Sequence, residues 1–283
     1  MTDIAHLKTW IGRTEEATDV AVGAPLAGLA ALLDHEEPPW APNELPPLAH
    51  WLYFLPRARQ SDIDVDGHPK RGGFLPPVPL PRRMWAGSRI EFLAAIPLGA
   101  TMRRRSTIAS VEGKSGTTGD MVFVTLRHEI SVAGSAALIE EQDIVYREPP
   151  KQSASGSTSR ETKESPPQSE WTRTVTPDPV QLFRYSALTF NGHRIHYDRD
   201  YCRTVEGYPG LVVHGPYSAT LLVDHFLRRN LRTPIAWLHL RARAPLFDTA
   251  PFDLCGIMQA DGARLWTRGP SGETAMELTL TCG

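Results

Sequence analysis

The sequence predicts an α+β protein in which one plan, a helix followed by antiparallel strands, occurs twice. A helix-like apolar segment precedes a series of strand-like segments in residues 1–147, and the same succession returns in residues 171–283. Residues 148–170 lie between the two. They consist mainly of Ser, Thr, Pro, Lys and Glu, with one alanine and no larger apolar residue, so they cannot bury enough surface to order themselves. We therefore predict two domains, 1–147 and 171–283, joined by a flexible linker.

The overall composition is that of a globular protein. Hydrophobic residues make up 41% of the 283 residues and charged residues 22%, which is enough to build a core. The net charge of −2 provides no positive surface for nucleic acid or an anionic membrane. No apolar run reaches the roughly 18 residues of a membrane span. These features predict neither a nucleic-acid partner nor a membrane partner.

The cysteines and the amino terminus predict a cytoplasmic protein. Three cysteines cannot all pair, none lies in a C-x-x-C motif, and no basic segment followed by an apolar run begins the chain. The sequence contains neither a dinucleotide-binding fingerprint nor ligand-spaced Cys and His residues. We expect no metal and no redox cofactor.

The first half should begin with a short helix or strand in residues 5–20. A buried helix is predicted at 24–35, because Pro25 suits a first turn and leucines follow at helical spacing. Residues 46–58 are predicted to form an aromatic strand, and residues 59–87 a long, packed and functional loop. Alternating apolar residues then predict strands at 89–95, 101–112, 120–130 and 136–146.

The second half should contain helices at 178–188 and 216–229. Strands are predicted at 234–246, 252–260, 263–268 and 273–282. The segment GAPLAGLAALLDH (23–35) faintly resembles GPYSATLLVDH (215–225). This similarity suggests an internal duplication; chance likeness between two Ala/Leu-rich helices explains it equally well.

Residues 183–224 concentrate polar and titratable side chains just before an apolar helix that opens on Gly215-Pro216. The first N–H groups of a helix are unpaired and carry partial positive charge. A polar loop directed at such a helix start suits a reaction in which negative charge develops.

The polar loop resembles the MaoC-like superfamily of (R)-specific enoyl-thioester hydratases and 3-hydroxyacyl-thioester dehydratases. The usual signature is Asp, one residue, Asn, Pro, an aliphatic residue and His, followed by an apolar-His-Gly turn. Here NGHRIH (191–196) stands at the signature and VHG (213–215) at the turn. Together with FRYSALTFNGHRIHYD (183–198), the first-half phrase GGFLPPVPLPRRMWAG (72–87) resembles the branch of type-2 3-hydroxyacyl-thioester dehydratases and of mesaconyl-C4-CoA and itaconyl-CoA hydratases.

This resemblance implies a double hotdog, in which two antiparallel sheets each wrap around a central helix and pack as a pseudo-dimer. The first half would form the acyl pocket and the second would carry catalysis. The implied activity is a hydro-lyase acting on an α,β-unsaturated acyl-CoA, with a short dicarboxylic or branched substrate such as mesaconyl-C4-CoA or itaconyl-CoA; CoA is part of the substrate. The alternatives are a 3-hydroxyacyl-ACP dehydratase of fatty-acid synthesis and a non-catalytic acyl-thioester binding module. The doubled fold implies a monomer or a homodimer.

Three residues are the main catalytic candidates. His196 is the expected base, because an imidazole can take up and release protons near neutral pH. Asn191 would hold the attacking water, and the N–H of Gly215 would donate to the thioester oxygen, where a side chain would obstruct the ligand. Asn191 replaces the usual Asp of the signature, and an amide cannot accept a proton as a carboxylate does.

Other residues are weaker candidates. Asp198, His193 and His214 could support the base, or they could simply shape or solvate the loop. A free carboxylate on the substrate favours a planar Arg partner, and four arginines are candidates against the default of surface residues. They are Arg194, Arg184, Arg82 and Arg83.

Overall fold

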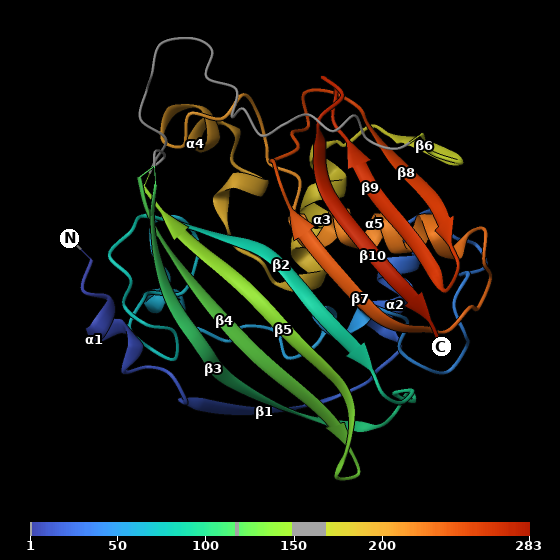
Figure 1. The fold of residues 1–283 in the computed structure, drawn as a ribbon, viewed down its shortest axis with the longest axis horizontal. Helices are drawn as coiled ribbons and strands as arrows, with labels where there is room; N and C mark the ends of the chain where they lie inside the picture. Colours follow the sequence, from blue (N-terminus) through green and yellow to red (C-terminus); the bar gives the residue numbers. More distant parts are fainter. Residues whose placement is uncertain (1, 117–118, 149–167) are drawn as a thin grey trace.

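The computed structural model describes residues 2–116, 119–148 and 168–283. Ten antiparallel strands form one continuous sheet in the order β1-β3-β4-β5-β2-β7-β10-β9-β8-β6 (Figure 1). The first five are β1 (Thr14–Val20), β2 (Arg82–Phe92), β3 (Thr101–Gly116), β4 (Gly119–Val132) and β5 (Ser135–Arg147). The second five are β6 (Trp171–Val175), β7 (Ile235–Ala242), β8 (Phe252–Gln259), β9 (Gly262–Arg268) and β10 (Thr274–Cys282).

Both sets of five strands have the same order. Read from the outer edge inward, the first set runs β1-β3-β4-β5-β2 and the second β6-β8-β9-β10-β7. The two sets meet at the centre, where β2 pairs with β7 from Gly87–Arg241 to Glu91–Trp237. Two sheets were expected; edge pairing of β2 with β7 joins them into one. The domain boundary stays a prediction, since residues 149–167 of the linker lie outside the described residues.

Alternation of buried and exposed residues explains the strands. In β4, Val122, Val124, Leu126, His128 and Ile130 are buried, while the residues that alternate with them are more exposed. Apart from the one at 46–58, the strands predicted in both halves are present with shifted bounds. β6 was not predicted, because its five residues, WTRTV, are too few for a periodic signal.

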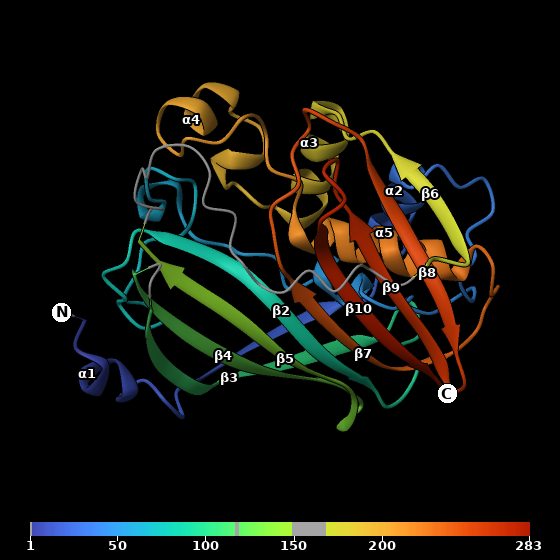
Figure 2. The same cartoon turned by 45° about the horizontal axis from the view of Figure 1, so that its top comes forward.

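The helices are α1 (Ile4–Lys8), α2 (Ala24–Leu32), α3 (Pro179–Thr189), α4 (Arg199–Thr204) and α5 (Gly215–Leu227). Helix α5 packs on β8, β9 and β10 and is buried from Tyr217 to Leu227. Helix α2 packs on α3 instead (Figure 2). In chain order α2 follows β1 as α3 follows β6, so the positional counterpart of α2 in the second half is α3. The sequence similarity between 23–35 and 215–225 instead relates α2 to α5, and these two helices do not occupy equivalent places.

The first half therefore has no counterpart of α5 among its described helices. Residues 33–81 cross the face of its sheet as loops with two short 3₁₀ turns, η1 (Ala49–Leu52) and η2 (Gln60–Asp62). The strand predicted at 46–58 is wrong. Leu48 and Phe54 adopt positive φ angles of 68° and 53°, and this left-handed backbone cannot continue a strand. Among the described residues, no helix is long and apolar enough to cross a membrane.

A buried carboxylate connects α5 to its surroundings. Asp224, 2% exposed, accepts hydrogen bonds from His35 Nε2 (2.5 Å), Arg173 Nη2 (3.0 Å) and Arg228 Nε (2.8 Å). His35 lies just beyond α2 and Arg173 lies in β6. One side chain thus connects three separate segments of the chain.

We predict that Asp224→Ala lowers the free energy of unfolding by about 3–5 kcal/mol, because it leaves the partner cations without their buried anion. Exposed Asp200→Ala is the control and should cost less than about 0.5 kcal/mol. Urea denaturation compares the two variants. Equal midpoints would show that Asp224 is not a structural centre.

Candidate active site

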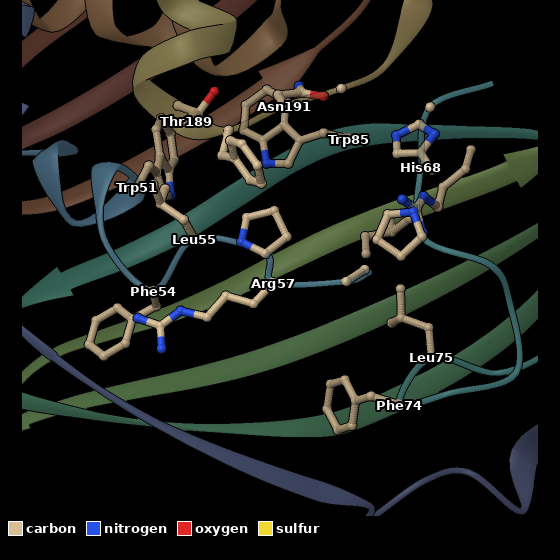
Figure 3. A pocket seen from close by; sticks show the side chains of 18 of the residues that line it. Trp51, Phe54, Leu55, Arg57, His68, Phe74, Leu75, Trp85, Thr189 and Asn191 are labelled. Carbon is tan, nitrogen blue, oxygen red and sulfur yellow. The ribbon is translucent and has the colours of Figure 1, made fainter. Parts of the chain in front are cut away.

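A cleft of about 1540 Å³ lies between the first-half sheet and the loop that carries the signature (Figure 3). Its floor includes Arg104, His128 and Glu140 of β3, β4 and β5, and its walls include Asn191 and His214. The cleft occupies the face of the first-half sheet where a helix equivalent to α5 would lie. Both halves therefore contribute to one cavity.

Local hydrogen bonds fix the signature loop after α3. Phe190 ends the helix in a left-handed conformation (φ 47°), and Asn191 Oδ1 then accepts a hydrogen bond from the N–H of His193 (3.0 Å). This Asx turn leads into the 3₁₀ turn η3 (Arg194–His196). The NH₂ group of Asn191 is left for the cavity.

His196 is buried and held in one tautomer. Its Nδ1–H donates to the carbonyl oxygen of Val212 (2.8 Å), so Nε2 carries the lone pair. Its ring stacks on His214 at a centroid distance of 3.6 Å, and His214 lines the cavity whereas His196 is not among the lining residues. Burial lowers the pKa of His196 to about 4, which makes it a neutral imidazole at pH 7.

The other two signature histidines lie against His196. The His193 ring meets it edge-on at 5.5 Å, and His214 Nε2 is 2.8 Å from Ser186 Oγ. Burial lowers the pKa of both, to about 2 for His193 and well below the usual value for His214. The structure thus brings together three neutral imidazoles and Asn191.

Gly215 begins α5, and a first-half residue covers it. A Cβ at this position would lie 2.7 Å from Cε3 of Trp85, so the indole ring occupies space that we expected a ligand to need. Trp85 Nε1 donates to Ser88 Oγ (3.2 Å), and Ser88 Oγ donates to Glu140 Oε1 (2.6 Å). Figure 3 shows Trp85 beside Asn191 on the cavity wall.

Glu140 is the centre of this buried network. It is 2% exposed and also accepts from His50 Nε2 (3.0 Å) and Trp51 Nε1 (3.2 Å). Burial alone would raise its pKa, but hydrogen bonds from His50 and Ser88 and the nearby His50 and His128 bring the pKa to about 2. An ionised carboxylate therefore orients Trp51 and Trp85 at the site.

Several predicted residues are engaged elsewhere. Asp198 caps α4 by accepting from Tyr201 N (2.9 Å) and forms an ion pair with Arg194 (2.7 Å). Arg82 pairs with Glu206 (3.1 Å), and Arg184 is exposed on α3 away from the cavity lining. These contacts give Asp198, Arg194 and Arg82 structural tasks.

Arg83 differs from the other three candidate arginines. It lines the cavity and, among the described residues, has no carboxylate within salt-bridge distance. Its positive charge acts on His68, His193 and Tyr146. It is therefore a cation available to a ligand.

Sequence reasoning missed a first-half hairpin that docks on the signature loop. Residues 62–70 turn tightly, with Asp64 N bonded to His68 O (2.7 Å) and Lys70 N to Asp62 O (2.8 Å). Arg194 N donates to the carbonyl oxygen of Asp66 (2.9 Å). The sequence predicts a functional loop at 59–87 with Arg82 and Arg83 as candidates within it, but not Asp66 or His68; the turn sequence DVDGH (64–68) was the available signal.

The hairpin places a carboxylate and an imidazole beside the signature. Asp66 Oδ2 accepts from His68 Nδ1 (3.0 Å), and the His68 ring lies 4.0 Å from that of His193. Asp66, His68 and His193 hold possible ligand atoms within 4.8 Å of one another. The positive charge of Arg83 and the existing Asp66–His68 bond disfavour a metal there, so we interpret the group as a hydrogen-bonded cluster.

Comparison with known proteins identifies the family. The model of the hydroxyacyl-thioester dehydratase type 2 family matches residues 48–248. The mesaconyl-C(4)-CoA hydratase of Chloroflexus aurantiacus is 47% identical over 280 residues, 99% of each chain. A MaoC-like dehydratase from Phytophthora capsici has a TM-score of 0.70 at 11% identity, covering 98% of this chain and 97% of that one. A Mycobacterium tuberculosis protein described as a double hotdog has a TM-score of 0.57 at 12% identity, covering 99% and 97%.

The fold is thus the double hotdog of MaoC-like hydratases and dehydratases, as the signature predicted. The chain belongs to the hydroxyacyl-thioester dehydratase type 2 family, and it is a hydro-lyase of the hydratase/dehydratase class. The alternative of a non-catalytic binding module is set aside.

We predict that Gly67→Ala disrupts the site. Gly67 has φ +91°, and a Cβ there would lie 1.8 Å from the carbonyl oxygen of Gly192, so the hairpin must move away from the signature loop. A shift of about 1 Å can lower kcat/KM by about 100-fold. Gly72→Ala is the matched control, with the same φ of +91° and no atom nearer than 3.9 Å. Equal activities of the two variants in a hydration assay would contradict this docking.

Proposed function

We propose that this hydro-lyase hydrates a short dicarboxylic enoyl-CoA, with mesaconyl-C4-CoA as the first candidate, and that it catalyses the reverse dehydration. The full-length identity to a mesaconyl-C(4)-CoA hydratase supports the substrate. The observation that carries the proposal is that Asn191, His214 and the cation Arg83 line one cavity, with the His196 ring stacked on that of His214. Acyl-CoA is preferred to acyl-ACP; a cytoplasmic location and a monomer or homodimer remain predictions.

His196 is the proposed base. With Nδ1–H committed to Val212, Nε2 accepts a proton from the water as its oxygen bonds to the β-carbon. The NH₂ group of Asn191 orients that water, since the Asn191 carbonyl is occupied by His193 N. The low pKa of His196 keeps the base in its neutral form at pH 7.

The amino end of α5 is the proposed site for the thioester oxygen. As water adds, the electron pair of the double bond moves toward this oxygen, and the unpaired N–H of Gly215 can donate to it. His214 and Pro216, on either side of Gly215, both line the cavity. Trp85 supports this end of the helix and excludes water from its covered side.

Arg83 is the proposed partner of the free carboxylate of the substrate. A guanidinium binds a carboxylate through two parallel hydrogen bonds, and Arg83 has no competing acid among the described residues. Asp198 and Glu206 engage Arg194 and Arg82. Arg83 is therefore favoured over the other three arginines.

The second candidate is dehydration of a longer 3-hydroxyacyl thioester. The cleft is large for a five-carbon acyl group, and apolar residues such as Phe54, Leu126 and Ile130 line part of it. The two candidate functions are distinguished by measuring kcat/KM for C4, C8 and mesaconyl-C4 thioesters, with the enoyl absorbance as the readout. Higher kcat/KM for the C8 substrate would favour the second candidate.

We predict that His196→Ala lowers kcat by two to four orders of magnitude, about the contribution of a general base, while the far-UV circular dichroism stays unchanged. Loss of enoyl absorbance measures the rate. His225→Ala, another buried histidine outside the cavity lining, is the control. Normal turnover in His196→Ala would rule out His196 as the base.

We predict that Arg83→Gln lowers kcat/KM for mesaconyl-C4-CoA by about 10- to 100-fold, the equivalent of one charge-assisted hydrogen bond. The kcat/KM for crotonyl-CoA, which has no free carboxylate, should fall much less. Arg184→Gln, at an exposed position on α3, is the matched control. An equal loss of kcat/KM for both substrates would show that Arg83 does not bind the free carboxylate.

A further inference from the structure

Hydration requires a proton donor for the α-carbon, and the groups assigned above include none apart from the protonated base itself. Asn191 stands where the signature usually has an Asp, and an amide does not donate a proton in this way. Asp198, the nearest acid in the sequence, caps α4 and pairs with Arg194. A donor distinct from the base must therefore come from another segment, and the inference that follows rests on the proposed function.

The first-half hairpin brings such a group to the site. His68 lines the cavity, and its ring lies 4.0 Å from His193, which in turn lies 5.5 Å from His196. The contact is fixed by backbone groups: Arg194 N donates to Asp66 O (2.9 Å), Arg194 Nη1 donates to Val65 O (3.1 Å), and Gly67 lies on Gly192. His68 is thereby held on the same side of the cavity as the signature.

Asp66 orients His68 as a carboxylate orients a catalytic imidazole. Asp66 Oδ1 accepts from the backbone N–H of His68 (2.9 Å), and Oδ2 accepts from Nδ1 (3.0 Å). Both side chains are about one-fifth exposed, at 20% and 21%. With Nδ1 bonded to the carboxylate, Nε2 is the atom free to exchange a proton with a ligand.

We propose that His68 is the general acid that protonates the α-carbon, and that Asp66 is its positioning residue. The first half then supplies the proton donor and the second half supplies the base. The Asp66–His68 pair takes over the task for which Asn191 is unsuited.

During hydration, every proton and electron pair is accounted for. One O–H bond of water breaks, its proton goes to Nε2 of His196, and the oxygen bonds to the β-carbon. The electron pair of the double bond moves toward the thioester as an enolate. The α-carbon then takes the Nε2 proton of His68 in its imidazolium form, while the Nδ1 proton stays on the hydrogen bond to Asp66. One proton is taken up and one is released, so transfer from His196 to His68 through solvent restores both groups.

The surroundings of His68 lower its pKa, which makes its imidazolium a stronger acid and restricts that protonated form to acidic pH. Burial lowers its pKa, as do the guanidiniums of Arg83 and Arg71, whereas Asp66 raises it. Neutral His193 faces it from the signature loop. Activity should rise with pH as His196 loses its proton and fall with pH as His68 loses its own.

The first test is chemical rescue. His68→Ala should lower kcat at least about 100-fold without lowering the melting temperature by more than a few degrees, and added imidazole should restore part of the rate. Exposed His239→Ala is the control and should match the wild type with or without imidazole. Full activity in His68→Ala, or a loss that imidazole does not restore in a folded variant, would overturn the assignment.

The second test is the pH profile of Asp66→Asn. Removing the carboxylate lowers the pKa of His68, so the falling limb of kcat should move to lower pH by about one unit. The rising limb, which reports His196, should stay in place. A lower rate with an unmoved falling limb would overturn the role of Asp66, because a purely structural residue would act in that way.

Failure of the proposed substrate and failure of the His68 assignment give different results. If the wild type does not hydrate mesaconyl-C4-CoA, the proposed substrate is wrong. If the wild type hydrates it and His196→Ala is inactive while His68→Ala is fully active, the proposed function stands and the His68 assignment alone fails.

Discussion

The contact between the first-half hairpin and the signature loop is the constraint on which the rest of the site depends. Gly67 lies so close to the carbonyl of Gly192 that no side chain fits between them, and Arg194 N is bonded to Asp66 O. These are backbone contacts, so they set the separation of the two loops independently of any ligand. Because the contact joins residues from both halves, neither half contains the complete site.

The first half forms a pocket on the face where the second half carries its central helix. Its strands keep the order seen in the second half, yet loops cross the face that α5 covers in the other sheet. A buried polar network remains on that face, with Glu140 orienting Trp51 and Trp85. The Trp85 ring lies against Gly215, so a carboxylate in the first half supports the helix start that the second half offers to the thioester.

Local patterns predicted the strands and the signature, because both depend on neighbours in sequence. The alternation in β4 is visible in its residues, and NGHRIH and VHG are each contiguous motifs within one short segment of the chain. Other features depend on distant contacts. The strand predicted at 46–58 is broken by left-handed residues, the space expected at Gly215 is filled from β2, and Asp66 and His68 reach the site from more than 120 positions away in sequence, as the Val65–Arg194 separation of 129 shows.

The most direct measurement is a crystal structure of His196→Ala with mesaconyl-C4-CoA bound. A site built from both halves predicts that the acyl carbons contact Asn191 and the first-half hairpin together, with the thioester oxygen near the start of α5. An acyl group that contacts only one half, or that lies in the smaller pocket between Trp40 and Ile235, would contradict it.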